Sequence, residues 1–347
     1  MKKWLCMLLA GALVFSLTAC HRNQQDNPDS SSINTETAGG TTEASVPPTE
    51  NPKTDFQYEI STNGDAVYIN KYIGASRNVV IPSQIDGLPV ATIKGIAGEG
   101  GLVQEGAFEG CDIQSVTIPH SVTAIGLHAF KDCKELVQIT IPDNLEILID
   151  GAFQNCKKLE SIDLSATKLT QLNELTFYDC VNLKEIALPS GLTRICAKAF
   201  YNCSSLLEIN LPEELVRIDD AAFVNCASLK TITIQTKLNM ISIKAPAFRD
   251  IPKLETIIFQ EGCEKITGYG FFVTESNVEI KIPKSVTQFS PETFFIHGSA
   301  KVVFEGDCPE IVGENDFYGE PTIFYNPNTV GWDTCVWKSQ YALKPIE

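Results

Sequence analysis

The chain has 347 residues, a formal net charge of −16 at pH 7 and 44% hydrophobic residues. We expect no nucleic-acid partner, because phosphate binding needs a patch of Lys and Arg side chains and no segment gathers them. The chain has 12 cysteines and 4 histidines, and no C-x-x-C pair accompanies the repeated cysteines, so we also expect no metal or other cofactor.

The N-terminal stretch MKKWLCMLLAGALVFSLTAC is typical of an export signal, with two lysines, an apolar run and small residues before Cys20. The run is too short to favour a permanent membrane span. Leu17-Thr18-Ala19-Cys20 resembles the lipobox of bacterial lipoproteins. The resemblance implies that the signal peptide 1–19 is removed and Cys20 is lipidated, which anchors the chain to the bacterial membrane on its extracytoplasmic side, exposed at the cell surface. Ordinary secretion with cleavage near Ala19 is the alternative.

Residues 20–54 follow as a tether rich in Ser, Thr and Pro that holds almost nothing to bury. The fold is expected to start near Phe56. Residues 55–100 would form an N-terminal cap and a first coil, with a hairpin across Asn63-Gly64-Asp65. The GEGG cluster at 98–101 lacks the Lys-Ser/Thr of a phosphate-binding loop, so it predicts an ordinary loop.

A repeat of 22 to 25 residues then dominates the sequence. Its phenylalanines are Phe108, Phe130, Phe153, Phe177, Phe200, Phe223, Phe248, Phe271, Phe294 and Phe317. A cysteine follows three residues after the first six, at Cys111, Cys133, Cys156, Cys180, Cys203 and Cys226. Such a period predicts a stack of similar units, each of which buries its apolar face against its neighbours.

Each repeat also carries Leu-x-x-Ile-x-Ile/Leu-Pro, as in LVQITIP and LLEINLP. Apolar alternation that ends at proline predicts a short strand, and a second apolar pair predicts another brief extended segment. We therefore predict a β-rich repeat solenoid over 101–320, with about ten stacked coils and short parallel strands. Residues 321–347 would form a C-terminal cap, in which Tyr325, Trp332, Trp337 and Tyr341 cover the last coil.

These motifs resemble the BspA-like leucine-rich repeat family, whose repeat runs roughly Ile-Pro, Val-x-x-Ile-Gly, Ala-Phe-x-x-Cys, Leu-x-x-Ile. The resemblance is tight over 108–260 and looser over 261–320. It implies a binding protein, because family members are associated with adhesion. Departures occur at 164–177, which lacks Ile-Pro, and in the last coils, which lose the cysteine.

The six repeated cysteines are expected to form a column of buried, unpaired thiols. Their spacing suits packing between coils better than a tetrahedral metal site, and an S–H group in a tight turn can reach a carbonyl. Cys308 and Cys335 flank the C-terminal cap. A disulfide between these two residues and two separate thiols both remain open.

Residues suited to catalysis are sparse. His120, His128 and His297 fall where stacking would keep them from converging with a carboxylate. Glu213-Glu214 and Asp219-Asp220 are adjacent in sequence instead of facing each other across a cleft, so a solvated face is the expected role of both pairs. The sequence therefore predicts no enzyme. An extracellular enzyme and a passive structural protein of the cell envelope are the alternatives to a binding protein.

Strand residues between the buried positions must point outward, because successive side chains alternate faces. They form two mainly polar columns, Ser115, Gln138, Ser161, Glu185, Glu208, Thr231, Thr256 and Glu279, and Thr117, Thr140, Asp163, Ala187, Asn210, Thr233, Ile258 and Lys281. The predicted binding surface is centred on Asp163, Glu185, Glu208 and Asn210. The partner would be a protein or glycan at the cell surface that is basic or bridged by cations. The aromatic end cap is the competing site.

Overall fold

The structure is a computed structural model, and it describes residues 49–97, 103–238, 240–241, 245–268, 270–273, 277–297, 299–313 and 317–347. The proposed signal peptide, Cys20, most of the tether and the GEGG cluster lie outside these residues. One compact unit runs from Pro48 to Glu347. Asn51 already belongs to it, because its backbone N–H donates to the carbonyl of Val80 at 2.8 Å. The fold therefore starts a few residues before Phe56. No helix among the described residues is long and apolar enough to cross a membrane.

The predicted N-terminal hairpin is confirmed. After a 3-10 turn, η1 (Lys53–Asp55), strand β1 (Phe56–Ile60) pairs antiparallel with β2 (Val67–Tyr72). The second strand also pairs in parallel with β5 (Leu88–Ile93), which in turn pairs with β9 (Ala124–Ile125). The hairpin is thus continuous with the first stacked strands and covers the end of the repeat array.

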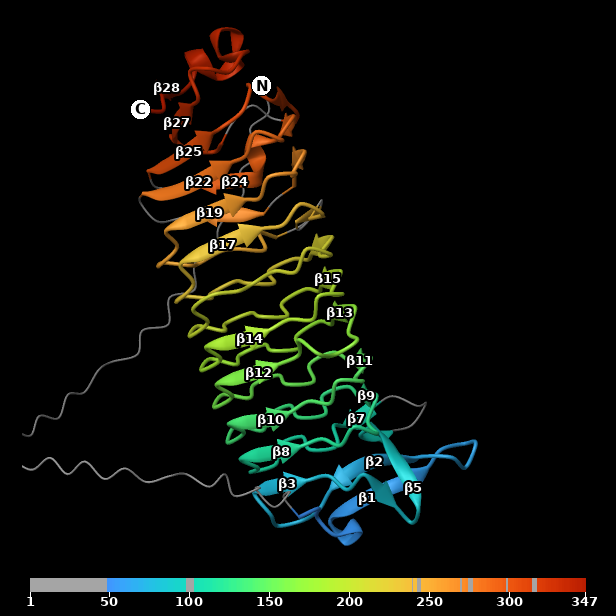
Figure 1. Cartoon of the computed structure of the whole chain (residues 1–347). Helices are drawn as coiled ribbons and strands as arrows, with labels where there is room; N and C mark the ends of the chain where they lie inside the picture. The colour runs from blue at the N-terminus through green and yellow to red at the C-terminus, as the bar shows by residue number, and fades with distance from the viewer. Residues whose placement is uncertain are drawn as a thin grey trace, which may run out of the picture. The chain divides into compact units, whose positions relative to one another are not determined.

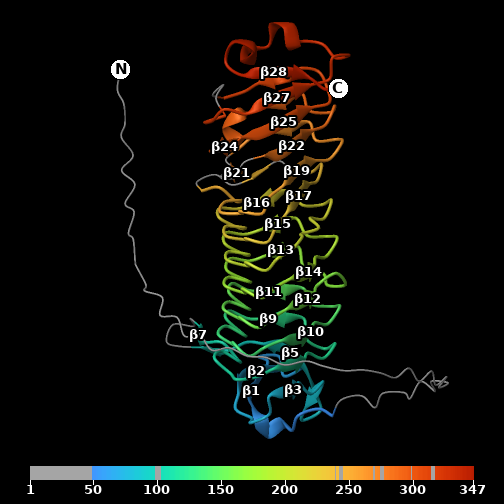
Figure 2. The same cartoon turned by 90° about the vertical axis from the view of Figure 1, so that its left-hand side faces the viewer.

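Two columns of parallel strands follow in chain order, and Figures 1 and 2 show them beside each other. The longer strands are β3 (Asn78–Val80), β8 (Ser115–Thr117), β10 (Gln138–Thr140), β12 (Ser161–Asp163), β14 (Glu185–Ala187), β17 (Thr231–Ile234), β19 (Thr256–Phe259), β22 (Val278–Ile282), β25 (Ala300–Phe304), β27 (Thr322–Tyr325) and β28 (Ala342–Pro345). The two-residue strands of the other column are β9, β11 (Ile147–Leu148), β13 (Gln171–Leu172), β15 (Arg194–Ile195), β16 (Arg217–Ile218), β18 (Met240–Ile241), β20 (Lys265–Ile266), β23 (Gln288–Phe289) and β26 (Glu310–Ile311).

The remaining strands are short pieces beside these columns: β4 (Gln84–Ile85), β6 (Ile96–Ala97), β7 (Val103–Glu105), β21 (Phe271–Val273) and β24 (Phe294–Ile296). Within each ladder of the long-strand column, residues pair with their counterparts on the neighbouring strand, as Ser161 does with Glu185 and Thr231 with Thr256. The ladders are β3-β8-β10, β12-β14 and the run from β17 to β28. The predicted β-solenoid with parallel strands is therefore confirmed.

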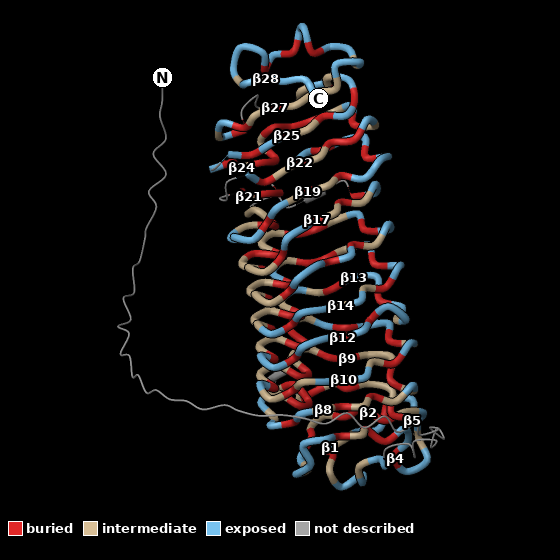
Figure 3. Tube along the Cα trace, turned by 60° about the vertical axis from the view of Figure 1, so that its left-hand side comes forward, coloured by how far each residue is buried: buried red, intermediate tan, exposed pale blue. Residues whose placement is uncertain are grey.

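The core is one continuous apolar column enclosed by the coils. The alternation in the sequence sets this arrangement, since Ile162 is buried between exposed Ser161 and Asp163. Figure 3 shows the same pattern in the long strands, with buried segments inside and exposed segments at the bends. In other repeats proline follows the strand, as Pro142 does after β10, and it cannot extend the ladder because it has no N–H to donate.

Repeat phenylalanines form a ladder of stacked rings along this core. Tyr72 stacks on Phe108 at a centroid distance of 5.2 Å, and the rings from Phe108 to Phe294 follow at 4.9 to 5.5 Å. Every ring of this run is buried. The predicted regular column changes at Phe317, which lies tilted against Phe289 at 5.7 Å and Trp337 at 5.3 Å. The bulky Phe289 side chain occupies space at this end of the core and turns the last ring.

The 3-10 turn η3 (Pro291–Thr293) lies within the repeats, whereas the C-terminal cap contains η4 (Trp332–Thr334) and η5 (Val336–Ser339). Trp332 and Trp337 are buried, and Tyr325 and Tyr341 pack against the core. The aromatic cover predicted for the last coil is therefore present. Strand β28 adds parallel pairing to β27 beyond it.

Candidate functional site

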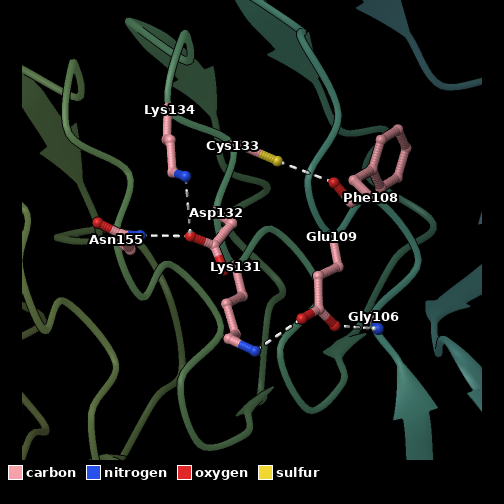
Figure 4. Close-up of polar contacts among 8 residues, drawn as sticks. All are labelled: Gly106, Phe108, Glu109, Lys131, Asp132, Cys133, Lys134 and Asn155. Atoms are coloured by element: carbon pink, nitrogen blue, oxygen red, sulfur yellow. Dashed lines mark hydrogen bonds and ion pairs between the residues drawn. The ribbon is translucent and has the colours of Figure 1, made fainter.

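Five of the six repeated cysteines lie in the core, and each thiol donates to the carbonyl of the phenylalanine one coil earlier. Figure 4 shows the first of these bonds, from Cys133 Sγ to Phe108 O at 2.9 Å. The others run from Cys156, Cys180, Cys203 and Cys226 at 3.1 to 3.3 Å. Burial raises the pKa of these thiols, which makes them poor nucleophiles and poor metal ligands.

Cys111 departs from the prediction of a fully buried column, because it is only half-buried. The chain beside it belongs to the hairpin region, where Tyr72 takes the place of a repeat phenylalanine. No repeat turn of the same shape covers Cys111 from that side. The packing role predicted for all six cysteines therefore applies to the five from Cys133 to Cys226 and less well to Cys111.

The outward columns of the long strands are exposed from Gln138 to Thr231 and half-buried towards both ends. Around Asp163, Glu185, Glu208 and Asn210 this face is hollowed, with a volume of about 360 Å³. Ser161, Ile162, Ile186 and Ala187 complete the lining. The structure thus brings all four residues of the predicted binding surface into one hollow.

The hollow has a simple origin in side-chain size. Ala187 pairs in register with Asp163 of the preceding strand, and Asn210 occupies the same repeat position in the next coil. The methyl group of Ala187 leaves a gap between these two longer side chains. Since a repeated alternation fixes the backbone, the gap is a preformed feature of the sheet face.

Charge in the hollow is entirely negative, because Asp163, Glu185 and Glu208 are its charged lining residues. The Asp163 carboxylate accepts hydrogen bonds from the Ser165 backbone N–H at 2.9 Å and from its hydroxyl at 2.6 Å. These bonds lower the pKa of Asp163. The Asp163 side chain is thereby held ionised and oriented at one edge of the hollow.

The lining of the hollow includes no histidine, cysteine, lysine or arginine, and its Ser161 pairs in register with Glu185. Its open, polar shape differs from the mostly apolar enclosed pockets that hold small molecules.

The three histidines considered in the sequence analysis do not line the hollow. His120 pairs with Asp143 at 2.7 Å on the surface, His128 is half-buried in a repeat turn, and His297 contacts the Phe272 ring at 5.0 Å. Over the described residues, no group of three or more His, Cys, Asp or Glu side chains could hold a metal ion.

The prediction of a solvated face is wrong for Asp219. Its side chain is buried, with 8% of the residue exposed, and its carboxylate accepts two hydrogen bonds from Arg194 at 2.9 and 2.6 Å. Arg217 contacts the same carboxylate from its own coil. The small Ala221 and Ala222 follow in the turn, so the carboxylate lies against the chain instead of extending into water. Glu214 meets the expectation, with an exposed pair to Lys237.

The sequence analysis missed one column of structural residues. The residue before each core cysteine has a positive φ, as at Asp132 (58°), Asn155 (61°) and Asn202 (60°). Asn and Asp tolerate this conformation better than most residues. Their side chains also link coils, since Asn202 Nδ2 donates to Asp179 Oδ1 at 2.7 Å, and Figure 4 shows the contact between Asn155 and Asp132. The signal in the sequence is the recurrent Gly, Asp or Asn directly before the cysteine.

Several solved bacterial structures resemble the chain. A leucine-rich repeat protein of T. pallidum is 24% identical, with 74% of this chain and 86% of that chain covered and a TM-score of 0.29. A leucine rich cell surface protein from Faecalibacterium prausnitzii is 20% identical, with 78% and 97% covered and a TM-score of 0.34. The pneumococcal vaccine antigen PcpA is 15% identical, with 84% and 97% covered and a TM-score of 0.33.

No curated protein matches the chain. The model of the BspA type leucine rich repeat region does match it, in 6 copies over residues 102–226 and 170–301. The matched residues span more than half of the chain and coincide with the stacked coils. The protein therefore belongs to the BspA-type leucine-rich repeat family.

Proposed function

We propose that the protein is a lipid-anchored cell-surface protein that binds another protein through its long-strand face, and that it serves adhesion or protein–protein interaction. Membership of a family of repeat proteins that typically bind supports interaction over catalysis. The observation that carries the proposal is the preformed acidic hollow around Asp163, Glu185 and Glu208. A rigid surface lowers the ordering cost of binding, which favours this face as the contact.

The expected partner presents a basic side chain to the hollow. Three carboxylates without a basic lining residue attract a cation, and this attraction weakens as salt screens it. The face lacks the Trp, Tyr and Arg side chains that usually dominate tight interfaces. Binding should therefore be moderate in strength and sensitive to salt. A glycan partner would instead bind with little dependence on salt.

The test uses Ala187→Arg, which fills the hollow and places a positive charge among its three carboxylates. Thr140→Arg is the matched control, since Thr140 is exposed in the same column two coils earlier. Surface extracts and purified matrix proteins are captured on the parent chain and on both variants. A specific partner should bind the parent and the control and should be lost with Ala187→Arg. A triple change of Asp163, Glu185 and Glu208 to Lys should also abolish binding while the circular dichroism spectrum is retained.

Equal binding to Ala187→Arg would move the contact away from the hollow, with the aromatic end cap as the next candidate. No specific capture by any of the three proteins would favour the passive structural role. The anchor is tested separately by mass spectrometry of the mature protein from its native host. We expect Cys20 as the lipid-modified N-terminus, and an unmodified N-terminus elsewhere would refute the anchor.

A further inference from the structure

A second group of reactive side chains lies at the C-terminal cap, away from the acidic hollow. Cys308 follows β25, and Cys335 lies between η4 and η5. The two side chains lie close enough for each to shift the pKa of the other. Both also line a surface hollow of about 410 Å³ together with Pro309, Gly331 and Thr334. The two cysteines are therefore neighbours at one hollow, where Cys308 is half-buried and Cys335 is buried with 8% of the residue exposed.

Backbone geometry brings the two segments together. The Cys308 N–H donates to the Val330 carbonyl at 3.0 Å. Next to it, Gly331 has a φ of 90°, and a Cβ at that position would lie 3.1 Å from the Cβ of Cys308. Glycine supplies both the left-handed conformation and the close approach. The approach of η4 to Cys308 is thus built into the chain.

The environment of this pair differs from that of the cysteine column. In the column each thiol bonds to a carbonyl of the preceding coil and is fully buried, whereas Cys308 is only partly buried. The neighbouring Cys308 side chain lowers the pKa of Cys335, against the opposing effect of burial and with a smaller lowering by the Trp337 backbone N–H. A thiolate forms more readily at Cys335, and the thiolate is the nucleophile in disulfide exchange.

We propose that Cys308 and Cys335 are a reversible dithiol–disulfide pair that locks the C-terminal cap onto the last repeat coil. The co-reactant is a small disulfide or a disulfide-bearing oxidoreductase. One cysteine thiolate, Cys335 by preference, attacks a sulfur of that disulfide and releases one thiolate in a mixed disulfide. The Cys308 thiol then loses its proton and attacks Cys335 Sγ, which releases the second thiolate. The protein loses two electrons and two protons, and the co-reactant becomes two thiols.

The consequence for the cap follows from what lies on either side of Cys335. Trp332 and Trp337 are buried on both sides of it, and β28 continues the sheet from β27. A covalent link to Cys308 closes the chain from β26 to η4 into a loop and restricts the opened states of the cap. Oxidation should therefore slow the opening of β27 and β28, and reduction should release it.

The experiment treats the full chain with excess oxidised glutathione, quenches with acid, alkylates free thiols and maps the peptides by mass spectrometry. We expect one linked peptide pair, Cys308 with Cys335, while Cys133 to Cys226 are alkylated only after denaturation. Dithiothreitol should restore both alkylated peptides. Hydrogen exchange of β27 and β28 should be slower in the oxidised protein than in the reduced protein, with no change in β12 and β14.

Three variants test whether the link is specific to Cys308 and Cys335. Cys308→Ser should prevent the link, whereas Cys263→Ser, which changes a thiol outside the pair, should leave it intact. Gly331→Ala should slow link formation because its methyl group pushes η4 away from Cys308. Separate alkylation of Cys308 and Cys335 after oxidation, or stable mixed disulfides with glutathione on both, would overturn the pair. A link that leaves the exchange of β27 and β28 unchanged would overturn the locking role.

Discussion

Cys133 donates its thiol hydrogen bond not within its own turn but to the carbonyl of Phe108, one coil earlier, at 2.9 Å. The same relationship repeats up to Cys226, which bonds to Phe200 at 3.3 Å. The Phe108 carbonyl also accepts a hydrogen bond from the Cys111 backbone N–H at 3.1 Å, so the Cys133 thiol is its second donor. One small residue thereby fills the turn and adds a hydrogen bond between neighbouring coils.

Thiol labelling should reveal this arrangement. With a bulky maleimide at neutral pH, the half-buried Cys111 should react first among the six repeated cysteines, and Cys133, Cys156, Cys180, Cys203 and Cys226 should react only after denaturation, because burial raises the pKa of their thiols. Peptide mapping after timed quenching measures the rates. Native rates for the five core cysteines equal to those in urea would contradict the burial described here.

Replacing Phe200 by alanine should destabilise the folded unit by about 3 to 5 kcal/mol, since the change deletes a fully buried ring from a close-packed core. The neighbouring rings of Phe177 and Phe223 lie 5.4 and 5.0 Å from it and would lose their stacking partner. Phe200→Leu, which keeps most of the volume, is the control and should cost less. Urea unfolding followed by circular dichroism gives both values. If the two variants lost equal free energy of unfolding, packing volume would not be the main cause of the loss.

Relieving backbone strain at Lys198 should stabilise the protein. Lys198 is exposed and has a φ of 55°, a conformation that disfavours side chains with a Cβ. Lys198→Gly should raise the free energy of unfolding by about 0.5 to 1 kcal/mol, after the entropic cost of glycine in the unfolded chain is subtracted. Lys157→Gly is the matched control at an exposed position without a positive φ, and it should destabilise. If both variants destabilise equally, the left-handed strain at Lys198 is negligible.

The buried carboxylate of Asp219 should matter more than exposed ones. Asp219→Asn keeps the shape but removes the charge that Arg194 and Arg217 share, with an expected loss of about 1 to 3 kcal/mol. Glu214→Gln is the comparison, because the pair of Glu214 with Lys237 is exposed and worth less than about 1 kcal/mol. Both are measured by urea unfolding at low and moderate salt. A loss at Glu214 as large as that at Asp219 would contradict the role given to burial.

Mild acid should weaken the fold through His128. Burial, with a smaller effect of the nearby Lys131 charge, lowers the pKa of His128 below its ordinary value of 6.5. The unfolded chain therefore binds a proton more readily, so stability is unaffected above that value and falls as the pH drops below it. His128→Asn, which tolerates the φ of 54° at this site, should show a smaller loss between pH 7.5 and 5.5. The effect should be small, because the ring is partly exposed. If the parent chain and His128→Asn lost equal stability over this pH range, His128 would not be the cause.

Sequence reasoning reached the fold because the repeat constrains it so strongly. The spacing from Phe108 to Phe294 defines the stacked rings, and the alternation around Ile162 defines which side chains face out. The same alternation predicted which strand face holds the hollow. The hollow itself depends on the small size of Ala187 between two longer side chains. The burial of Asp219 could not be predicted, because Arg194 lies in the preceding coil and reaches the carboxylate only after the coils stack.

The links described here reach mainly from one coil to the next, as the bonds from Cys133 to Phe108 and from Asn202 to Asp179 do. Such a molecule behaves like a one-dimensional chain of units coupled to their nearest neighbours. A defect in a middle coil, at Phe200 for example, would therefore divide the array into two segments that melt separately, while an equal defect beside either cap would shorten a single cooperative segment from its end.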